Sequence, residues 1–261
     1  KVIEESPSSL VDEDMRKEMG EQALLLAKAV NYSSAGTVEF VASNDKSFYF
    51  LEMNTRLQVE HPVTELVTGI DLVEKMINIS AKKPLGLVQS DIKLTGWSVE
   101  ARIYAENPIR HFAPSIGRLR KFIPPKLKEM STRLDSGVQE GGEISMYYDP
   151  MIAKLITYGK DRKEACSKLS SALDAFVIKG VSTNIPFVNS VLTNKKFLSG
   201  NITTAFLEEE HPKGYSGLLK SKEKILLISL ASLAMKAIEI NRESKLNKGN
   251  YVVIISKHHF E

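Results

Sequence analysis

The sequence predicts an α+β fold, in which helix-rich segments near the start precede a region of short strands. Apolar residues recur at helical spacing over residues 8–30 and 63–81. Polar and apolar residues alternate over 97–105, 118–122 and 133–138, and Gly and Pro separate these stretches. Separate runs of helices and strands are typical of the α+β class.

Composition limits the class of protein. With 261 residues and 43% hydrophobic residues, the chain is long enough for one large domain or two smaller ones. Its net charge is +3 and its basic residues are scattered, so we expect no nucleic-acid partner. The longest apolar run, residues 225–235, contains Ser and is too short to cross a membrane. Cys166 is the only cysteine, which excludes an internal disulfide and favours a reducing compartment.

The first elements follow from caps and turn residues. A helix over 8–30 is capped by Asp12 or Ser8. A hairpin joins 36–42 to a strand that starts at Phe48, through a loop over 44–47.

The next boundaries are set by Pro and Gly. Pro62 ends the strand and opens the helical region 63–81, which Gly69 breaks. The connector 82–86 contains Pro and Gly and is a candidate domain boundary.

After the three short strands, the chain becomes helical again. A helix is expected over 161–177 from an Asp cap, a second near 183–184 and a third near Thr203. Residues 212–221 are predicted to be a linker, followed by a long helix over 221–240. A strand over 251–255 follows, with no visible partner.

The polar residues at every even position from 52 to 60 are the most informative feature of the chain. An extended strand alternates its side chains between two faces, so one face would carry Glu52, Asn54, Arg56, Gln58 and Glu60. Glu and Asn are poor strand formers, so strand propensity does not explain this row. A solvated strand face with unrelated charges remains the alternative.

The hairpin register brings two carboxylates together. If Glu39 lies opposite Glu52, Val41 faces Phe50 and Ser43 faces Phe48. Opposite Cβ atoms lie about 5 Å apart, where like charges are destabilising unless a cation neutralises them. Asn54 adds an oxygen ligand, and carboxylate and amide oxygens suit Mg²⁺ or Mn²⁺ that also binds nucleotide phosphates.

The second half of the row has the residues for binding and deprotonating a small oxyacid. Arg56 can hold a planar anion by two contacts, and Glu60 can accept its proton. Alternatively, Arg56 and Glu60 form only a weak surface pair.

These motifs resemble a known family. The stretch from Glu52 to Glu65, EMNTRLQVEHPVTE, resembles the signature of the biotin carboxylase component of biotin-dependent carboxylases, which has the ATP-grasp fold. GTVEF at 36–40, EARIYAE at 100–106 and YYDPMIAKL at 147–155 also fit. The chain is most similar to the α subunits of propionyl-CoA carboxylases.

The resemblance implies a domain organisation. Residues 1–84 would be the C-terminal half of an ATP-grasp domain, and 85–211 the β-rich biotin carboxylase C-terminal subdomain. Residues 212–261 would begin a linker domain that docks the carboxyltransferase β subunit. The family's N-terminal domain, Gly-rich lid and nucleotide-binding lysines find no match in this chain. It also opens on Lys1 rather than Met, so we expect a fragment that is inactive alone.

The resemblance also implies roles for residues. It assigns metal binding to Glu39, Glu52 and Asn54, and bicarbonate binding to Lys1, Arg56, Gln58 and the backbone of Val59. It makes Glu60 the general base and Arg102 the residue that stabilises the biotin enolate. It assigns ATP contacts to Val41, Leu51, Glu52 and Thr204.

The implied reaction is ATP- and bicarbonate-dependent carboxylation of biotin on a separate carrier domain, through carboxyphosphate. The cofactors would be Mg²⁺ or Mn²⁺ and carrier-bound biotin, with ATP as substrate. An oligomer in a bacterial cytoplasm or mitochondrial matrix is expected. Three alternatives stay open: the same module of a methylcrotonyl-CoA or acetyl-CoA carboxylase, a different ATP-grasp ligase, and a non-catalytic assembly fragment.

Overall fold

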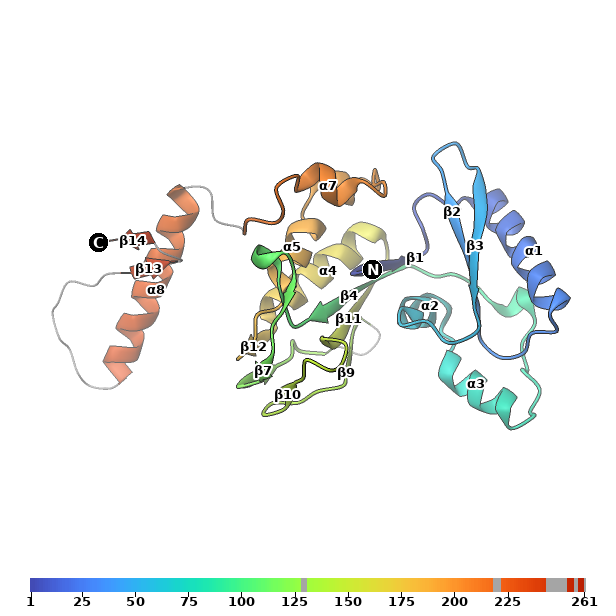
Figure 1. Ribbon diagram of the computed structural model, residues 1–261, viewed down its shortest axis with the longest axis horizontal. Helices are drawn as coiled ribbons and strands as arrows, with labels where there is room; N and C mark the ends of the chain where they lie inside the picture. The colour runs from blue at the N-terminus through green and yellow to red at the C-terminus, as the bar shows by residue number, and fades with distance from the viewer. Residues whose placement is uncertain (128–130, 218–221, 243–252, 256–257, 261) are drawn as a thin grey trace. The chain divides into compact units, whose positions relative to one another are not determined.

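The structure is a computed structural model that describes residues 1–127, 131–217, 222–242, 253–255 and 258–260 (Figure 1). The chain divides into two compact units, 1–216 and 217–261. The helices of the first unit are α1 (Glu13–Ala29), α2 (His61–Thr68), α3 (Leu72–Ser80), α4 (Arg162–Ala175), α5 (Ile185–Leu192), α6 (Lys195–Leu198) and α7 (Phe206–Glu210), with 3₁₀ turns at Gln89–Asp91 and Pro108–Arg110. Its strands are β1 (Ile3–Ser6), β2 (Thr37–Ala42), β3 (Phe48–Asn54), β4 (Trp97–Tyr104), β5 (Glu106–Asn107), β6 (Ala113–Pro114), β7 (Gly117–Arg118), β8 (Lys121–Ile123), β9 (Thr132–Ser136), β10 (Glu143–Ile144), β11 (Met151–Gly159) and β12 (Val177–Lys179).

A four-stranded antiparallel sheet in the order β1-β4-β11-β9 forms the centre of the first unit (Figure 1). Helix α4 packs against β4 and β11, and α2 also contacts β4. Alternate residues of β4, including Val99, Ala101 and Ile103, are fully buried in the apolar core with residues of α4 such as Leu169. The α+β prediction is confirmed.

The other face of this sheet is polar. Its register places Glu4 opposite Glu100, Arg102 opposite Lys154, and Lys154 opposite Asp135. Since side chains alternate along a strand, these residues share one face of the sheet. Glu100, Arg102 and Lys154 are all buried, so this polar layer lies inside the fold.

The main helices and strands predicted from the sequence are present, with shifted ends. The first helix begins at Glu13, because the Asp12 side chain accepts a hydrogen bond from the Met15 amide at 3.0 Å. Asp12 is therefore the cap rather than Ser8. Gly69 has a φ of 70° and separates α2 from α3.

Other predictions differ from the structure. Strand β1 was not predicted, since its four residues, IEES, show no clear alternation. The strand expected over 118–122 is two shorter ones, β7 and β8, which pair with β10 and β12. The helix expected near Thr203 begins at Phe206, and the short helix α6 was not predicted. The predicted domain boundaries at 84 and 211 remain predictions.

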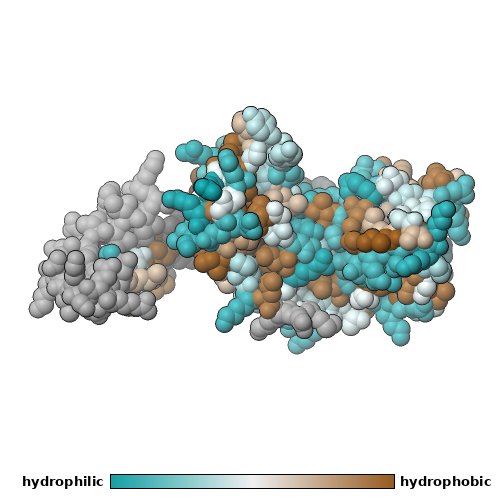
Figure 2. All heavy atoms as spheres, turned by 90° about the horizontal axis from the view of Figure 1, so that it is seen from below, coloured by the Kyte–Doolittle hydropathy of each residue, from teal (hydrophilic) through white to brown (hydrophobic). Residues whose placement is uncertain are grey.

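Several apolar side chains of the first unit are exposed. Seen from below, the surface carries hydrophobic side chains among hydrophilic ones (Figure 2). The exposed large residues include Leu24 and Leu25 of α1 and Tyr49, Phe50 and Leu51 of β3. The described residues leave these side chains uncovered.

The second unit contains α8 (Lys222–Arg242), β13 (Val253–Ile255) and β14 (His258–Phe260). The predicted long helix is confirmed, and the predicted strand is confirmed over 253–255, while 251–252 lie outside the described residues. The expectation that this strand has no partner was wrong, because Val253 pairs with Phe260 in an antiparallel ladder. In the described part of the chain, no helix has the length and hydropathy to cross a bilayer.

Candidate active site

The β2–β3 hairpin brings the predicted metal residues together. Glu39 of β2 lies opposite Glu52 of β3, as the sequence predicts, and Thr37 lies opposite Asn54. The Asn54 amide nitrogen donates to Glu39 Oε1 at 3.0 Å and to Glu52 Oε1 at 3.1 Å. All three candidate ligands therefore lie at one end of the hairpin.

The rest of the predicted hairpin register was wrong by one residue. Phe40, and not Val41, pairs with Phe50, and Ala42, and not Ser43, pairs with Phe48. A β-bulge after Glu39 leaves Leu51 as an extra residue on β3. A bulge carries no clear local sequence signal, so counting back from the Glu39–Glu52 pair gave the wrong partners beyond it.

The predicted polar strand face also ends earlier than expected. Strand β3 stops at Asn54, opposite Thr37, where its partner β2 begins. Residues 55–60 form an irregular turn that leads into α2. The Gln58 carbonyl accepts hydrogen bonds from the His61 amide at 3.3 Å and contacts His61 Nδ1 at 2.8 Å. Arg56, Gln58 and Glu60 therefore reach the site from a turn and not from a strand.

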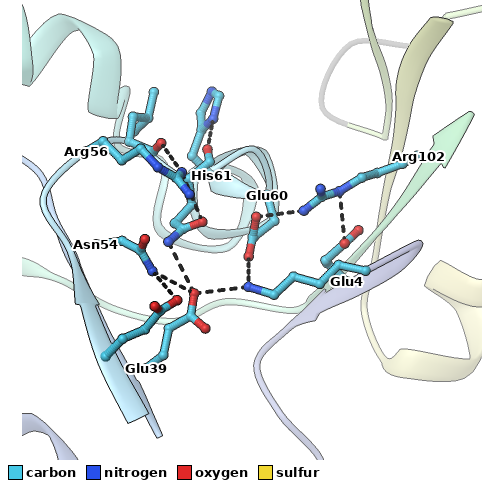
Figure 3. A network of polar contacts seen from close by, with 11 residues as sticks. Glu4, Glu39, Asn54, Arg56, Glu60, His61 and Arg102 are labelled. Atoms are coloured by element: carbon cyan, nitrogen blue, oxygen red, sulfur yellow. Dashed lines mark hydrogen bonds and ion pairs between the residues drawn. The ribbon is translucent and has the colours of Figure 1, made fainter. Parts of the chain in front are cut away.

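Glu39 connects the two halves of the site (Figure 3). Its Oε1 accepts hydrogen bonds from Lys1 Nζ at 3.0 Å, Asn54 Nδ2 at 3.0 Å and Gln58 Nε2 at 3.3 Å. Gln58 Oε1 in turn accepts a hydrogen bond from Arg56 Nη1 at 3.4 Å. The hairpin carboxylates and the turn residues thus form one polar network.

Glu60 lies between two cations. Its Oε1 accepts a hydrogen bond from Lys1 Nζ at 3.3 Å, and its Oε2 accepts one from Arg102 Nη2 at 2.8 Å (Figure 3). Burial tends to raise the pKa of Glu60, but a backbone hydrogen bond, Lys1 and Arg102 together lower it. The Lys1 ammonium has a raised pKa, mainly through its hydrogen bond to Glu39. At neutral pH Glu60 is therefore ionised and both cations are charged.

Arg102 also has contacts on β1, which pairs with its own strand β4. Its Nε lies 3.0 Å from Glu4 Oε1, an ion pair between two side chains that are about one tenth exposed. The Arg102 backbone amide also donates to the Val2 carbonyl at 2.9 Å. The pairing of β1 with β4 therefore brings both Lys1 and Arg102 next to Glu60, with Glu4 in contact with Arg102.

Two kinds of residue that support this turn were not predicted from the sequence. Lys154 of β11 donates from Nζ to the Val59 carbonyl at 2.7 Å and pairs with Asp135 of β9 at 3.4 Å. Lys154 lies in the YYDPMIAKL motif, so the motif marked the residue but not its role. Glu4 and Glu100 were also missed, because only the register of distant strands places them beneath Arg102.

Of the residues predicted to contact ATP, Glu52 belongs to this network, whereas Val41, Leu51 and Thr204 lie outside it. Val41 and Leu51 are exposed on the β2–β3 hairpin. Thr204 is exposed on the segment before α7. The contact of these three residues with ATP remains a prediction.

The ligand set fits a hard divalent cation that shares further oxygens with a substrate. No group of three or more His, Cys, Asp or Glu side chains within the described ranges could hold a metal ion. The candidate set is instead two carboxylates and one amide, and Mg²⁺ commonly completes such sets with water and phosphate oxygens. Asn54 now directs its nitrogen at both carboxylates, so its amide would have to rotate to offer Oδ1.

Two domain models match the chain. A model of the biotin carboxylase C-terminal domain matches residues 100–209. A model of the ATP-binding domain of the carbamoyl-phosphate synthase L chain matches residues 1–88. Together they cover both segments that contribute to the polar network.

Known proteins are similar over most of the chain. It is 49% identical to the propionyl-CoA carboxylase alpha chain of Ruegeria pomeroyi, over 95% of this chain and 39% of that protein. It is 51% identical to the mitochondrial propionyl-CoA carboxylase alpha chain of Homo sapiens, over 93% of this chain and 34% of that protein. The chain thus spans less than half the length of these curated relatives.

A solved structure is also similar. The biotin carboxylase domain dimer of the Hydrogenobacter thermophilus 2-oxoglutarate carboxylase, in complex with MgADP, ADP and bicarbonate, is 42% identical with a TM-score of 0.78. The match covers 81% of this chain and 46% of that one.

Proposed function

Because the chain belongs to the biotin carboxylase family, we propose that it contributes half of an active site for ATP- and bicarbonate-dependent carboxylation of biotin. The observation that carries this proposal is the position of Glu60. It is an ionised carboxylate between Lys1 and Arg102, at one end of a network whose other end has the features of a metal site. The whole reaction requires further parts of a longer protein.

We assign a task to each end of the network. Glu39, Glu52 and Asn54 would hold Mg²⁺ or Mn²⁺, which would neutralise phosphate charge on ATP. Arg56, Gln58 and the Val59 backbone would bind bicarbonate, and Lys154 fixes Val59 from behind. Val41, Leu51 and Thr204 remain candidates for contacts with the nucleotide.

Glu60 would act first, as a base, and Arg102 would act second, by stabilising a negative charge. Glu60 would accept the proton of bicarbonate, so that the anion can attack the terminal phosphate of ATP and give carboxyphosphate. Arg102 would then stabilise the oxyanion of biotin from which the proton at N1 has been removed. Because Arg102 already touches Glu60, the two steps share one small region of the site.

The test separates the two steps in a full-length protein that contains this segment. Glu60→Ala should abolish bicarbonate-dependent ATP cleavage, whereas Arg102→Ala should reduce biotin carboxylation at least about tenfold more than ATP cleavage. Arg120→Ala, which removes an exposed arginine, is the matched control. Equal losses of both activities in Arg102→Ala would contradict its role.

The metal assignment has its own test in this chain. Mn²⁺ binding, followed by electron paramagnetic resonance, should weaken at least about tenfold in Glu39→Gln and Glu52→Gln but not in Glu143→Gln. Unchanged binding in both variants would disprove the metal site. The chain alone is expected to show no bicarbonate-dependent ATP cleavage, and measurable turnover would refute that expectation.

The acceptor of the carboxyl group is a further proposal. The propionyl-CoA carboxylase names of the relatives favour propionyl-CoA, with a biotin carrier domain and a carboxyltransferase β subunit as partners in an oligomer. A similar module in a 2-oxoglutarate carboxylase shows that the module itself does not fix the acceptor. Coupled assays with propionyl-, acetyl- and methylcrotonyl-CoA would decide. One bacterial and one mitochondrial relative favour a bacterial cytoplasm or a mitochondrial matrix.

A further inference from the structure

Two buried carboxyl groups lie beneath Arg102, and only one of them contacts it. Glu100 of β4 is fully buried, and neither of its oxygens has a hydrogen-bond partner among the described residues. It lies directly opposite Glu4 of β1, whose Oε1 contacts Arg102 Nε at 3.0 Å. Directly opposite side chains on one face have Cβ atoms about 5 Å apart, so these carboxyl groups influence each other.

Several charged groups act on this pair. They are Arg102 on the same strand, Lys154 on β11, Asp135 on β9, and Lys1 and Glu60. The same sheet face also carries Tyr104 and Arg133, and the helix α2 that packs against the sheet carries His61 and Glu65. Arg133 is already paired with Asp135 and Glu65. Arg102 is the cation that the structure shows in direct contact with Glu4.

The two carboxyl groups differ in how easily they ionise. The pKa of Glu100 is raised to about 8, mainly by burial, while Lys154 lowers it and the charge of Glu4 raises it. Burial also raises the pKa of Glu4 to about 7, against the lowering effect of Arg102. Glu4 thus loses its proton first, and its charge helps Glu100 to keep one.

The Arg102 guanidinium keeps an anionic partner throughout the proposed reaction only if one of its carboxylates stays ionised. It has two carboxylate partners, Glu60 at 2.8 Å and Glu4 at 3.0 Å. If Glu60 accepts a proton, its charge is lost and its attraction for Arg102 weakens. Glu4 then remains as the only anionic contact of the guanidinium in the described structure.

We propose that Glu4 is a positioning residue that holds Arg102 in place while Glu60 is protonated, and that Glu100 keeps a proton so that the pair carries a single negative charge. This inference rests on the proposed function, because it requires Glu60 to act as a base. Ionisation of Glu100 would place a second negative charge beneath Arg102 and draw the guanidinium away from the biotin oxyanion.

The two glutamates therefore respond differently to the same substitution. In a full-length protein, Glu4→Gln should lower biotin carboxylation at least about tenfold more than bicarbonate-dependent ATP cleavage. Glutamine resembles a protonated carboxyl group, so Glu100→Gln should stay within about threefold of the parent at pH 7. Above pH 8 the parent should lose carboxylation selectively, and Glu100→Gln should lack this decline.

Glu143→Gln is the matched control, since Glu143 is an exposed glutamate on a strand outside the site. Equal loss of both activities in Glu4→Gln, or an unchanged alkaline decline in Glu100→Gln, would overturn the proposal. A merely structural pair would lower both activities together and would leave the pH profile unchanged.

The protonation of Glu100 can also be measured directly in this chain, without an activity assay and without a substituted protein. Carbon-13 NMR of labelled glutamate side chains should show Glu100 protonated at pH 7, and an ionised Glu100 at that pH would overturn the proposal. Absence of all turnover in the full-length parent would instead refute the proposed function, while this titration would still decide the charge of the pair.

Discussion

At the residue scale, the buried carboxyl group of Glu100 makes folding stability depend on pH. Its pKa in the folded chain is about 8, above its ordinary value of 4.5. The stability that it contributes is therefore fully present below about pH 4.5 and is lost as the pH rises to about 8. Replacement by glutamine removes this dependence.

We predict that Glu100→Gln becomes more stable relative to the parent as the pH rises from 5 to 8. Each pKa unit corresponds to about 1.4 kcal/mol, so the relative gain should be on the order of 3 kcal/mol. Urea unfolding at the two pH values measures it, with Glu143→Gln as the exposed control. A constant difference between Glu100→Gln and the parent would contradict the raised pKa.

Single residues of the site were predictable where one local pattern contained both partners. Glu39 and Glu52 lie on adjacent strands of one hairpin, so their pairing could be proposed from the sequence, although the bulge after Glu39 shifts the other pairs by one residue. Glu4 and Lys154 were not predictable in the same way, because they lie on strands distant in sequence from the residues they support. The register between such strands is set by tertiary packing and not by local spacing.

At the element scale, Arg162 of α4 links strand β1 to the helices α4 and α6. Arg162 Nε donates to Glu5 Oε2 at 2.6 Å, and Nη1 donates to the carbonyls of Phe197 at 2.7 Å and Leu198 at 3.0 Å. Glu5 Oε2 also accepts a hydrogen bond from Trp97 Nε1 at 2.9 Å. One guanidinium thus joins β1, α4 and α6.

Arg162→Ala should destabilise the chain by about 3 kcal/mol, because it leaves Glu5 partly buried without its cation. Arg162→Lys should recover only part of this loss, since one ammonium cannot reach Glu5 and both carbonyls with the planar geometry of arginine. Chemical denaturation measures both. Lys163→Ala, on the same helix, is the control, and equal stability of the parent and Arg162→Ala would refute the role of this link.

Two glycines with positive φ differ in what surrounds them. Gly69 ends α2 at φ 70° and has open space where a Cβ would be placed. Gly180 has φ 114°, and a Cβ there would lie 2.0 Å from the Arg118 carbonyl oxygen. Gly69→Ala should therefore cost about 1 kcal/mol, from backbone strain alone.

Gly180→Ala should cost at least about twice as much, because strain and a backbone clash add. Thermal unfolding of both variants tests the comparison. A smaller loss in Gly180→Ala than in Gly69→Ala would show that the strand connection after β12 can move to accept a side chain.

The strand predicted over residues 52–60 was correct only to Asn54, for a reason that lies outside that segment. Its partner β2 begins at Thr37, so residues beyond Asn54 have no neighbouring backbone to pair with. In the turn, Gln58 contacts Glu39 directly, Arg56 contacts Gln58, and Glu60 is linked to Glu39 through Lys1. The pattern therefore identified the site but gave the wrong local structure for half of it.

At the scale of the whole molecule, the apolar core lies in the first of the two units. The buried core cluster extends from Val99 to Tyr215, within residues 1–216. A chain that ends at Ser216 should therefore unfold at the same temperature as the full chain, within about 3 °C. Scanning calorimetry of both chains tests this, and a larger drop would show that residues 217–261 stabilise the first unit.

The overall class and most elements were predictable because caps, Pro, Gly and periodicity act locally. Asp161 and Asn184 mark helix starts that the structure retains. The order of the central sheet was not predictable, since it depends on pairing between β1, β4, β11 and β9 across long stretches of sequence.

The pairing of β1 with β4 has a kinetic consequence. Ile3 pairs with Ala101, so a loop of about one hundred residues must close before this contact forms, and such closure slows folding. The β2–β3 hairpin can form much earlier, within microseconds, because its strands are adjacent. A folding chain would therefore assemble the Glu39–Glu52 pair first and gain Lys1 and Arg102 around Glu60 only in a late step.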